Sequence, residues 1–169
     1  MSTRRFKLIK GGLSDGTVLS DLNDVAATAP VNGDVLTWNG TTWLPLEPVD
    51  YRQLGAHWGS TVALVAAEMP DIVVYFDRAT VIQSVTIIGD AAGSAILDIW
   101  KKARTSLPAV NADSITAAAN PTVTAARSSR DTTLTGWTKN VAAGDTLTFH
   151  VDSCSTFTQL TILLDCLGD

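Results

Sequence analysis

The sequence is short of charge and has no long apolar run. Only 17% of its 169 residues are charged, against roughly 25% in an average globular protein, and glutamate occurs only at Glu47 and Glu68. No stretch approaches the roughly 20 apolar residues of a membrane-spanning helix, so we expect no membrane insertion. Basic residues number 12 against 17 acidic ones, which argues against a nucleic-acid partner because phosphate binding needs a basic face.

Cysteine is also scarce. The two cysteines, Cys154 and Cys166, are too few for a disulfide framework. The basic residues 1–10 lead into Gly11 and Gly12 rather than into an apolar segment, so we expect no secretory leader. Both features predict synthesis in a reducing cytoplasm.

What the chain does have is threonine (22 residues) and alanine (21 residues), with β-favouring runs separated by turn residues. The runs span 72–76, 81–88, 95–101, 122–125, 132–134, 146–152 and 158–166. Several short strands at this spacing predict an all-β fold, an antiparallel β-sandwich or jelly roll. Residues 60–68 are compatible with either a short helix or a strand.

The last two runs allow a register to be predicted. Alternating apolar residues in 147–151 and 160–166 match if residue 151 pairs with 160, 149 with 162 and 147 with 164. This hairpin would separate Cys154 from Cys166 by on the order of 30 Å. A disulfide needs Cα atoms within roughly 7 Å, so none is expected between them.

The N-terminal part contains a second β-hairpin signal. One β-favouring run ends at Trp38, and a second run contains Trp43. Asn39 and Gly40 join the two runs, and this dipeptide is typical of tight hairpin turns. Prolines at positions 45 and 48 suppress regular structure. We therefore expect an extended anchor and hairpin over residues 1–45, a connector over 46–70 and a β-sandwich domain over 71–169.

Residues 19–25 (LSDLNDV) and 29–45 (APVNGDVLTWNGTTWLP) resemble a linker module of tailed-bacteriophage fibre, spike and minor structural proteins. The resemblance implies an anchoring or trimerising segment ahead of a distal β domain. The blocks 93–101 (GSAILDIWK), 134–138 (LTGWT) and 141–153 (VAAGDTLTFHVDS) resemble β-sandwich domains at the tips of phage fibres and spikes. That resemblance implies a homotrimer that contacts a receptor at its distal end.

Apolar residues on both faces of two predicted strands also favour a homotrimer. In 72–76 and in 81–88, large apolar side chains occupy odd and even positions alike, whereas a monomeric sandwich needs one apolar face per strand. Burial between copies would cover the second face. A central strand within one chain is the alternative.

Tryptophans are the candidate glycan-binding residues, because indoles stack on sugar rings and nearby carboxylates bind hydroxyl groups. Trp58, Trp100 and Trp137, with Asp113 in the long loop 102–121, make up this candidate site. The alternative for each tryptophan is a place in the core or at an interface between copies.

Catalytic and metal-binding patterns are weak. The bases of suitable pKa are His57 and His150, and no nucleophile motif accompanies them. Five aspartates are candidates for a glycosidase pair, but no spacing selects two of them, and we expect each at a turn or on the surface: Asp98, Asp113, Asp131, Asp145 and Asp152. We therefore predict no enzyme, no cofactor and no metal.

The basic N-terminus is a candidate particle anchor. Its charged and apolar residues suit an acidic capsid, collar or tail protein: Arg4, Arg5, Phe6, Lys7 and Lys10. The alternative is a solubilising tail. Taken together, the sequence predicts a virion appendage, which is a head spike, collar fibre or tail fibre, that attaches by its N-terminus and contacts a host glycan through the β domain. A decoration or adaptor protein without a receptor, and a carbohydrate-active enzyme, are the alternatives.

Overall fold

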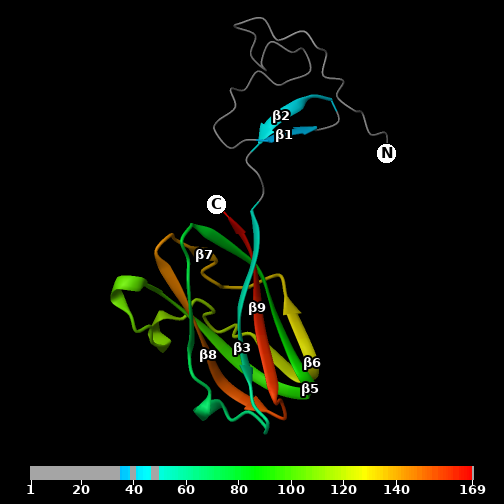
Figure 1. Cartoon of the computed structure of the whole chain (residues 1–169), viewed down its shortest axis with the longest axis vertical. Helices are drawn as coiled ribbons and strands as arrows, with labels where there is room; N and C mark the ends of the chain where they lie inside the picture. The colour runs from blue at the N-terminus through cyan, green and yellow to red at the C-terminus, as the bar shows by residue number, and fades with distance from the viewer. Residues whose placement is uncertain (1–34, 39–40, 47–49, 169) are drawn as a thin grey trace, which may run out of the picture. The chain divides into compact units, whose positions relative to one another are not determined.

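The computed structural model describes residues 35–38, 41–46 and 50–168 of the chain. Contacts divide the chain into two compact units, residues 1–48 and 49–169. The described part of the first unit is a hairpin, and the second unit is a β domain (Figure 1).

The hairpin consists of β1 (Val35–Trp38) and β2 (Trp43–Leu46), paired antiparallel. Trp38 lies opposite Trp43, and their ring centroids are 5.4 Å apart. The strand pair therefore closes at Trp38 and Trp43, and not at Trp38 and Thr41 as a two-residue turn at Asn39 and Gly40 would require. Facing aromatic side chains stabilise a strand pair. Asn39 and Gly40 themselves lie outside the described residues.

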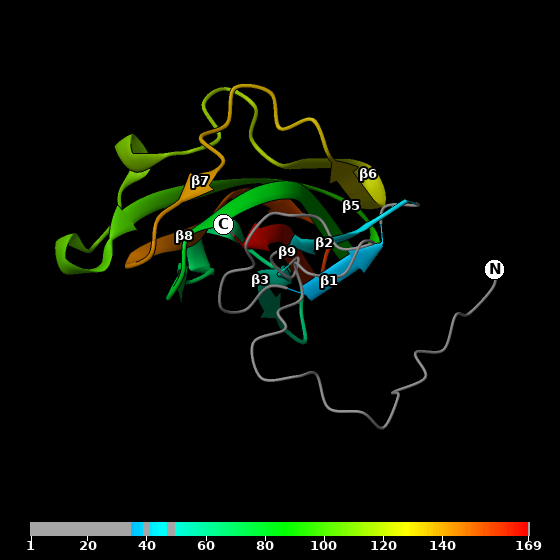
Figure 2. The same ribbon diagram turned by 90° about the horizontal axis from the view of Figure 1, so that it is seen from above.

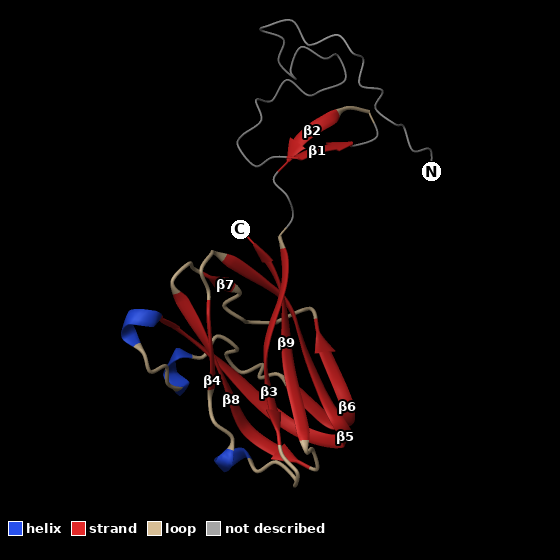
Figure 3. Ribbon diagram, in the orientation of Figure 1, coloured by secondary structure: helices blue, strands red, loops and turns tan. Residues whose placement is uncertain are grey.

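The second unit is all-β, and its strands pair antiparallel in one curled sheet (Figures 1 and 3). Its strands are β3 (Tyr51–Gly59), β4 (Ile72–Tyr75), β5 (Thr80–Ala103), β6 (Thr122–Asp131), β7 (Asn140–Val141), β8 (Asp145–Ser155) and β9 (Gln159–Gly168). The helices described are single 3-10 turns: Ala66–Glu68, Arg104–Ser106 and Asn111–Asp113. Residues 51–59, which we assigned to a connector, are thus a strand of this sheet.

The curl of the sheet follows from one long strand. β5 is 24 residues long and pairs with β9 along residues 80–89 and with β8 along residues 94–103. Gly89 is the last residue of the first segment and Gly93 comes just before the second, and a Cβ atom on either would collide with the ring of the fully buried Phe157. The two glycines therefore make room for Phe157 at the point where the partner of β5 changes. Figure 2 shows the resulting curl from above.

Several expected strand boundaries were wrong. The runs 81–88 and 95–101 form the single strand β5, and residues 132–134 are not a strand. Asp131 ends β6 by accepting hydrogen bonds from the backbone amides of Thr133 and Leu134, which turns the chain. Within residues 60–68, the only regular element described is the 3-10 turn at its end.

The predicted hairpin of the last two strands was also wrong. β8 pairs with β4 and β5, whereas β9 pairs with β3 and β5, so residue 151 lies beside Leu97 and residue 160 beside Gly89. The matching alternation of apolar residues identified both strands correctly. It cannot distinguish two strands that pair with each other from two strands that each pair with a third strand. Cys154 lies opposite Ala95 and Cys166 opposite Ile82, and both thiols are free.

The core lies on the inner face of the curled sheet, and a β-bulge explains part of its composition. Ile82 pairs with Cys166 but Ser84 pairs with Asp165, so Gln83 is an extra residue in β5. The extra residue reverses the alternation, and Ile82, Val85 and Ile87 are consequently all buried. The apolar residues on both faces of 81–88 therefore do not by themselves require a second copy of the chain.

Candidate functional site

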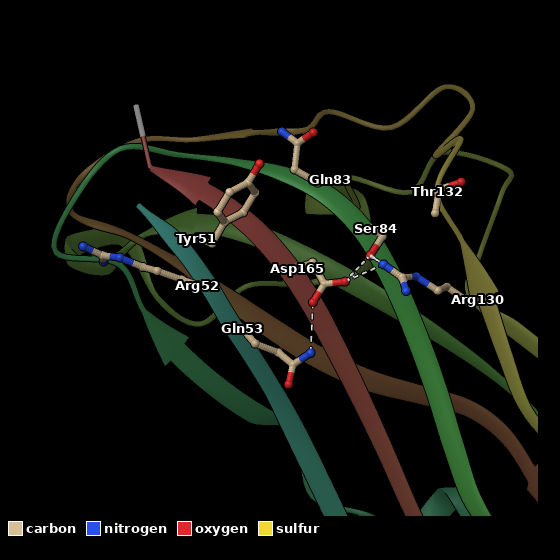
Figure 4. A pocket seen from close by; sticks show the side chains of 8 residues that line it. All are labelled: Tyr51, Arg52, Gln53, Gln83, Ser84, Arg130, Thr132 and Asp165. Carbon is tan, nitrogen blue, oxygen red and sulfur yellow. Dashed lines mark hydrogen bonds and ion pairs between the residues drawn. The ribbon is translucent and has the colours of Figure 1, made fainter. Parts of the chain in front are cut away.

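A groove of about 640 Å³ lies on the outer face of the sheet, where β3, β9, β5 and β6 run side by side (Figure 4). Its volume is within the range of small-molecule sites. The residues that line it are mostly polar: Tyr51, Arg52, Gln53, Gln83, Ser84, Arg130, Thr132 and Asp165.

Strand pairing places these side chains around Asp165. β9 lies between β3 and β5, with Gln53 directly opposite Asp165 on one side and Ser84 opposite it on the other. The bulge at Gln83 adds a side chain to this edge of the groove, and Arg130 comes from β6, next to β5. Bulges recur beside functional sites because they redirect side chains.

Three side chains hold the carboxylate of Asp165 in place (Figure 4). Ser84 donates from Oγ to Oδ2 at 2.6 Å, Gln53 donates from Nε2 to Oδ1 at 2.9 Å, and Arg130 donates from Nη2 to Oδ2 at 2.9 Å. The hydrogen bonds from Ser84 and Gln53, and then the charge of Arg130, lower the pKa of Asp165 below its usual value. Asp165 is therefore an ionised, fixed acceptor at neutral pH.

Tyr51 supplies the aromatic surface of the groove. It is the first residue of β3 and is 76% exposed. In Figure 4 its ring and the amide of Gln83 project from the strands on either side of β9. An exposed ring beside fixed polar groups is the combination that binds sugars, because the ring packs on C–H groups while the polar atoms bind hydroxyls.

The structure places the three predicted glycan-binding tryptophans in packed positions. Trp58 and Trp137 donate their indole N–H groups to the carbonyls of Pro70 and Ala119, and Trp100 donates to Asp98. Each of the three indoles is less than a tenth exposed. They lie apart from the groove, and in this conformation they offer a sugar little ring surface.

Asp113 lies in the loop after β5, and its carboxylate also forms hydrogen bonds within the chain. Its carboxylate accepts hydrogen bonds from Lys102 at 2.8 Å and from the backbone amide of Val110 at 2.9 Å. The bond from Lys102 is the main cause of a lowered pKa of Asp113. This aspartate therefore shapes the base of the loop and does not line the groove around Asp165.

The expectation that Asp98 lies at a turn or on the surface was wrong. Asp98 is in the middle of β5 and is 3% exposed. Its carboxylate accepts hydrogen bonds from the backbone amide of Ile99, the indole of Trp100 and the hydroxyls of Ser114 and Thr116. The loop that carries Ser114 and Thr116 folds back over the strand, which buries the carboxylate.

Each of the two histidines contacts neighbouring side chains of the β domain. His150 stacks on Trp100 with ring centroids 4.6 Å apart and contacts Asp71 at 2.7 Å. His57 contacts the hydroxyl of Thr161 at 2.9 Å. Neither ring lines the groove around Asp165.

Comparison of the chain with models of protein families, with curated proteins and with solved structures found no match. Function is therefore inferred from the groove together with the sequence resemblance.

Among the described residues, no cluster of three or more histidine, cysteine, aspartate or glutamate side chains has an arrangement that would hold a metal ion. None of the helices in that part of the chain has the length and apolar character required to cross a membrane. The predicted particle-anchor residues Arg4, Arg5, Phe6, Lys7 and Lys10 lie outside the described residues.

Sequence reasoning missed the groove because its residues come from four strands. Tyr51 and Gln53 occupy the outward-facing odd positions of β3, a strand that we had assigned to a connector, and Arg130 lies in a run that we expected to end at residue 125. The one available signal was Asp165, an acidic residue between apolar neighbours in the last strand. Its partners follow from strand order, which a single sequence does not give.

Proposed function

We propose that this chain is a non-enzymatic virion appendage protein whose β domain binds a host-surface glycan in the groove around Asp165. The observation that carries the glycan-binding part is the exposed ring of Tyr51 beside a carboxylate fixed by three donors. The resemblance of residues 19–45 and 93–153 to phage fibre and spike segments supports the appendage part. A hairpin followed by a separate β domain is compatible with an anchor, a linker and a tip.

Binding without catalysis is favoured by the charges in the groove. A glycosidase needs two carboxyl groups, one of them with a raised pKa so that it can donate a proton. Among the described residues that line the groove, Asp165 is the only carboxylate, and its pKa is lowered. It therefore accepts hydrogen bonds but is a poor proton donor at neutral pH.

The proposal includes a homotrimer, with the curled sheet as a sandwich-like tip domain. Support comes from β4, which pairs only with β8 among the described strands and so leaves one edge open. On its outer face, Val73 and Tyr75 are 49% and 52% exposed. Open edges and exposed apolar side chains are usually avoided in monomers, and a neighbouring copy would cover them.

Glycan binding tests the proposal. The full chain is applied to an array of bacterial and other cell-surface glycans, and we expect it to bind a restricted set. Tyr51→Ala removes the stacking surface, so it should weaken binding by about tenfold or more. Val62→Ala is the control, because it shortens another exposed apolar side chain that lies outside both the groove and the outer face of β4.

Equal binding by the wild type and Tyr51→Ala would show that the groove is not the site. If no glycan is bound, the receptor role is wrong and the adaptor or decoration role takes its place. Light scattering on the same samples gives the number of copies, for which three are expected. A stable monomer would contradict the trimer.

A further inference from the structure

We propose that the groove selects uncharged sugars and rejects acidic ones, an inference that rests on the proposed function and names its ligand class. The groove contains one guanidinium and one carboxylate at its centre, Arg130 and Asp165, and they are bonded to each other at 2.9 Å. Their charges cancel, so an acidic ligand would meet no unpaired positive charge at the centre of the groove.

The second arginine of the groove is paired as well. Arg52 contacts Asp50 at 2.7 Å and Asp77 at 3.3 Å, and in Figure 4 its side chain extends away from Asp165. The hydrogen bond and charge of Arg52 lower the pKa of Asp50, which keeps that carboxylate ionised beside it. An acidic sugar would therefore have to compete with two protein carboxylates for this guanidinium.

The remaining polar atoms suit hydroxyl groups, which both donate and accept hydrogen bonds. The three donors on Asp165 leave acceptor capacity on Oδ1, because an ionised carboxylate offers about four lone-pair positions. Arg130 uses only Nη2 toward partners among the described residues, so Nε and Nη1 remain as donors. Adjacent sugar hydroxyls can accept from Arg130 and donate to Asp165 at the same time.

A sugar carboxylate fits this set poorly. It only accepts hydrogen bonds, so it would leave the free position on Asp165 without a donor and would place a second negative charge beside the first. Like charges held close together at a partly desolvated site weaken binding, and such juxtapositions give specificity. The same atoms that favour a neutral sugar therefore act against an acidic one.

The test compares neutral and acidic sugars of matched structure. The full chain is titrated with neutral hexose tetrasaccharides, including galacto- and manno-tetraoses, and with tetragalacturonate and tetramannuronate, in which a carboxylate replaces the C6 hydroxymethyl group. These experiments are supplemented by the neutral and acidic sections of the glycan array. We expect binding in the neutral class, at least about tenfold tighter than any acidic ligand. Affinity should change little between low and high NaCl, because no net ligand charge is involved.

Asp165→Asn provides a second readout, because it changes the net charge of the Arg130–Asp165 pair from zero to positive. It removes the negative charge and leaves Arg130 unpaired, so the variant should gain affinity for the acidic tetrasaccharides relative to the wild type. Arg130→Gln leaves Asp165 as an unpaired charge and should bind neither acidic ligand. Circular dichroism confirms that each variant is folded.

The outcomes separate the two proposals. Preference for acidic glycans, with binding abolished in Tyr51→Ala, would overturn the inference on ligand charge but leave glycan binding in place. No binding in either class would overturn both. A folded Asp165→Asn variant without any gain toward acidic ligands would also contradict the charge argument.

Discussion

At the scale of single residues, Asp98 shows how a polar group is accommodated inside this fold. Its carboxylate accepts hydrogen bonds from four donors, two of which, Ser114 and Thr116, belong to the loop that covers β5. A buried carboxylate is tolerated only when its hydrogen-bonding capacity is used. Asp98 thus fixes the loop on the outer face of the sheet.

Asp98→Ala should lower the free energy of unfolding by about 3 kcal/mol, because it leaves several buried donors without an acceptor. Asp98→Asn keeps one carbonyl acceptor and should cost less. Urea denaturation followed by tryptophan fluorescence measures both variants. A loss below about 1 kcal/mol for the alanine variant would mean that water replaces the carboxylate.

The sequence held a partial signal for this cluster. A charged residue between Leu97 and Ile99 breaks an otherwise apolar strand, and a polar interruption of that kind indicates either an exposed face or a buried partner. The partners Ser114 and Thr116 lie 16 and 18 residues later in the chain. Only the path of the loop decides between the two possibilities, and that path has no local sequence pattern.

At the scale of elements, β5 determines the architecture because β8 and β9 both pair with it. Gly89 and Gly93 mark the change of partner, where the ring of Phe157 takes the space that side chains would need. Composition identified most strand cores, but it divided β5 in two because Gly89 and Gly93 look like turn residues. A glycine inside a strand can equally mark a close approach of another group.

Gly89→Ala should destabilise the domain by about 1–3 kcal/mol, because the added methyl group overlaps the ring of Phe157. The loss should be smaller in a Phe157→Leu background, where the ring is absent. Gly59→Ala is the control, since its Cβ would meet only the His57 side chain at 3.3 Å. Denaturant unfolding of the single and double variants gives the coupling, and strict additivity would contradict the proposed contact.

At the scale of the whole molecule, lowered pKa values of surface carboxyl groups predict how stability depends on pH. Asp50, Asp90, Asp113 and Asp165 all have pKa values below the ordinary 3.8 in the folded protein, chiefly through side-chain hydrogen bonds. A lowered folded-state pKa stabilises the protein above the unfolded-state pKa. That stabilisation is lost as pH falls through the folded-state value.

The contribution of these four groups to the free energy of unfolding should therefore be constant near neutral pH and should decline below about pH 4. Ser84→Ala removes the largest cause of the shift at Asp165, so it should reduce the acid-dependent part of the decline. Thermal unfolding between pH 2.5 and 7 tests this by comparing the loss of stability at acid pH in the variant and in the wild type. If the stability of the variant declines at acid pH just as that of the wild type does, Ser84 does not control the pKa of Asp165.

The class of fold was predictable, but its strand order and its groove were not. Threonine-rich alternating runs indicated an antiparallel all-β chain, and that was correct. The bulge at Gln83 escaped detection because it appears in the sequence only as a run with apolar residues on both faces, which we attributed to contacts between copies. One inserted residue changes which side chains are buried and also shapes the groove, so core and site were missed for the same reason.

The position of the groove would have a mechanical consequence if the chain serves as the proposed appendage. The chain joins the β domain at Asp50, whose carbonyl accepts a hydrogen bond from Gly168 at the end of β9, and the groove begins at the next residue, Tyr51. A pull between a sugar held in the groove and the N-terminal segment would pass through the ends of β3 and β9. Such a pull would therefore load the hydrogen bonds between β3 and β9 at this end of the domain before it reached the contacts around Phe157.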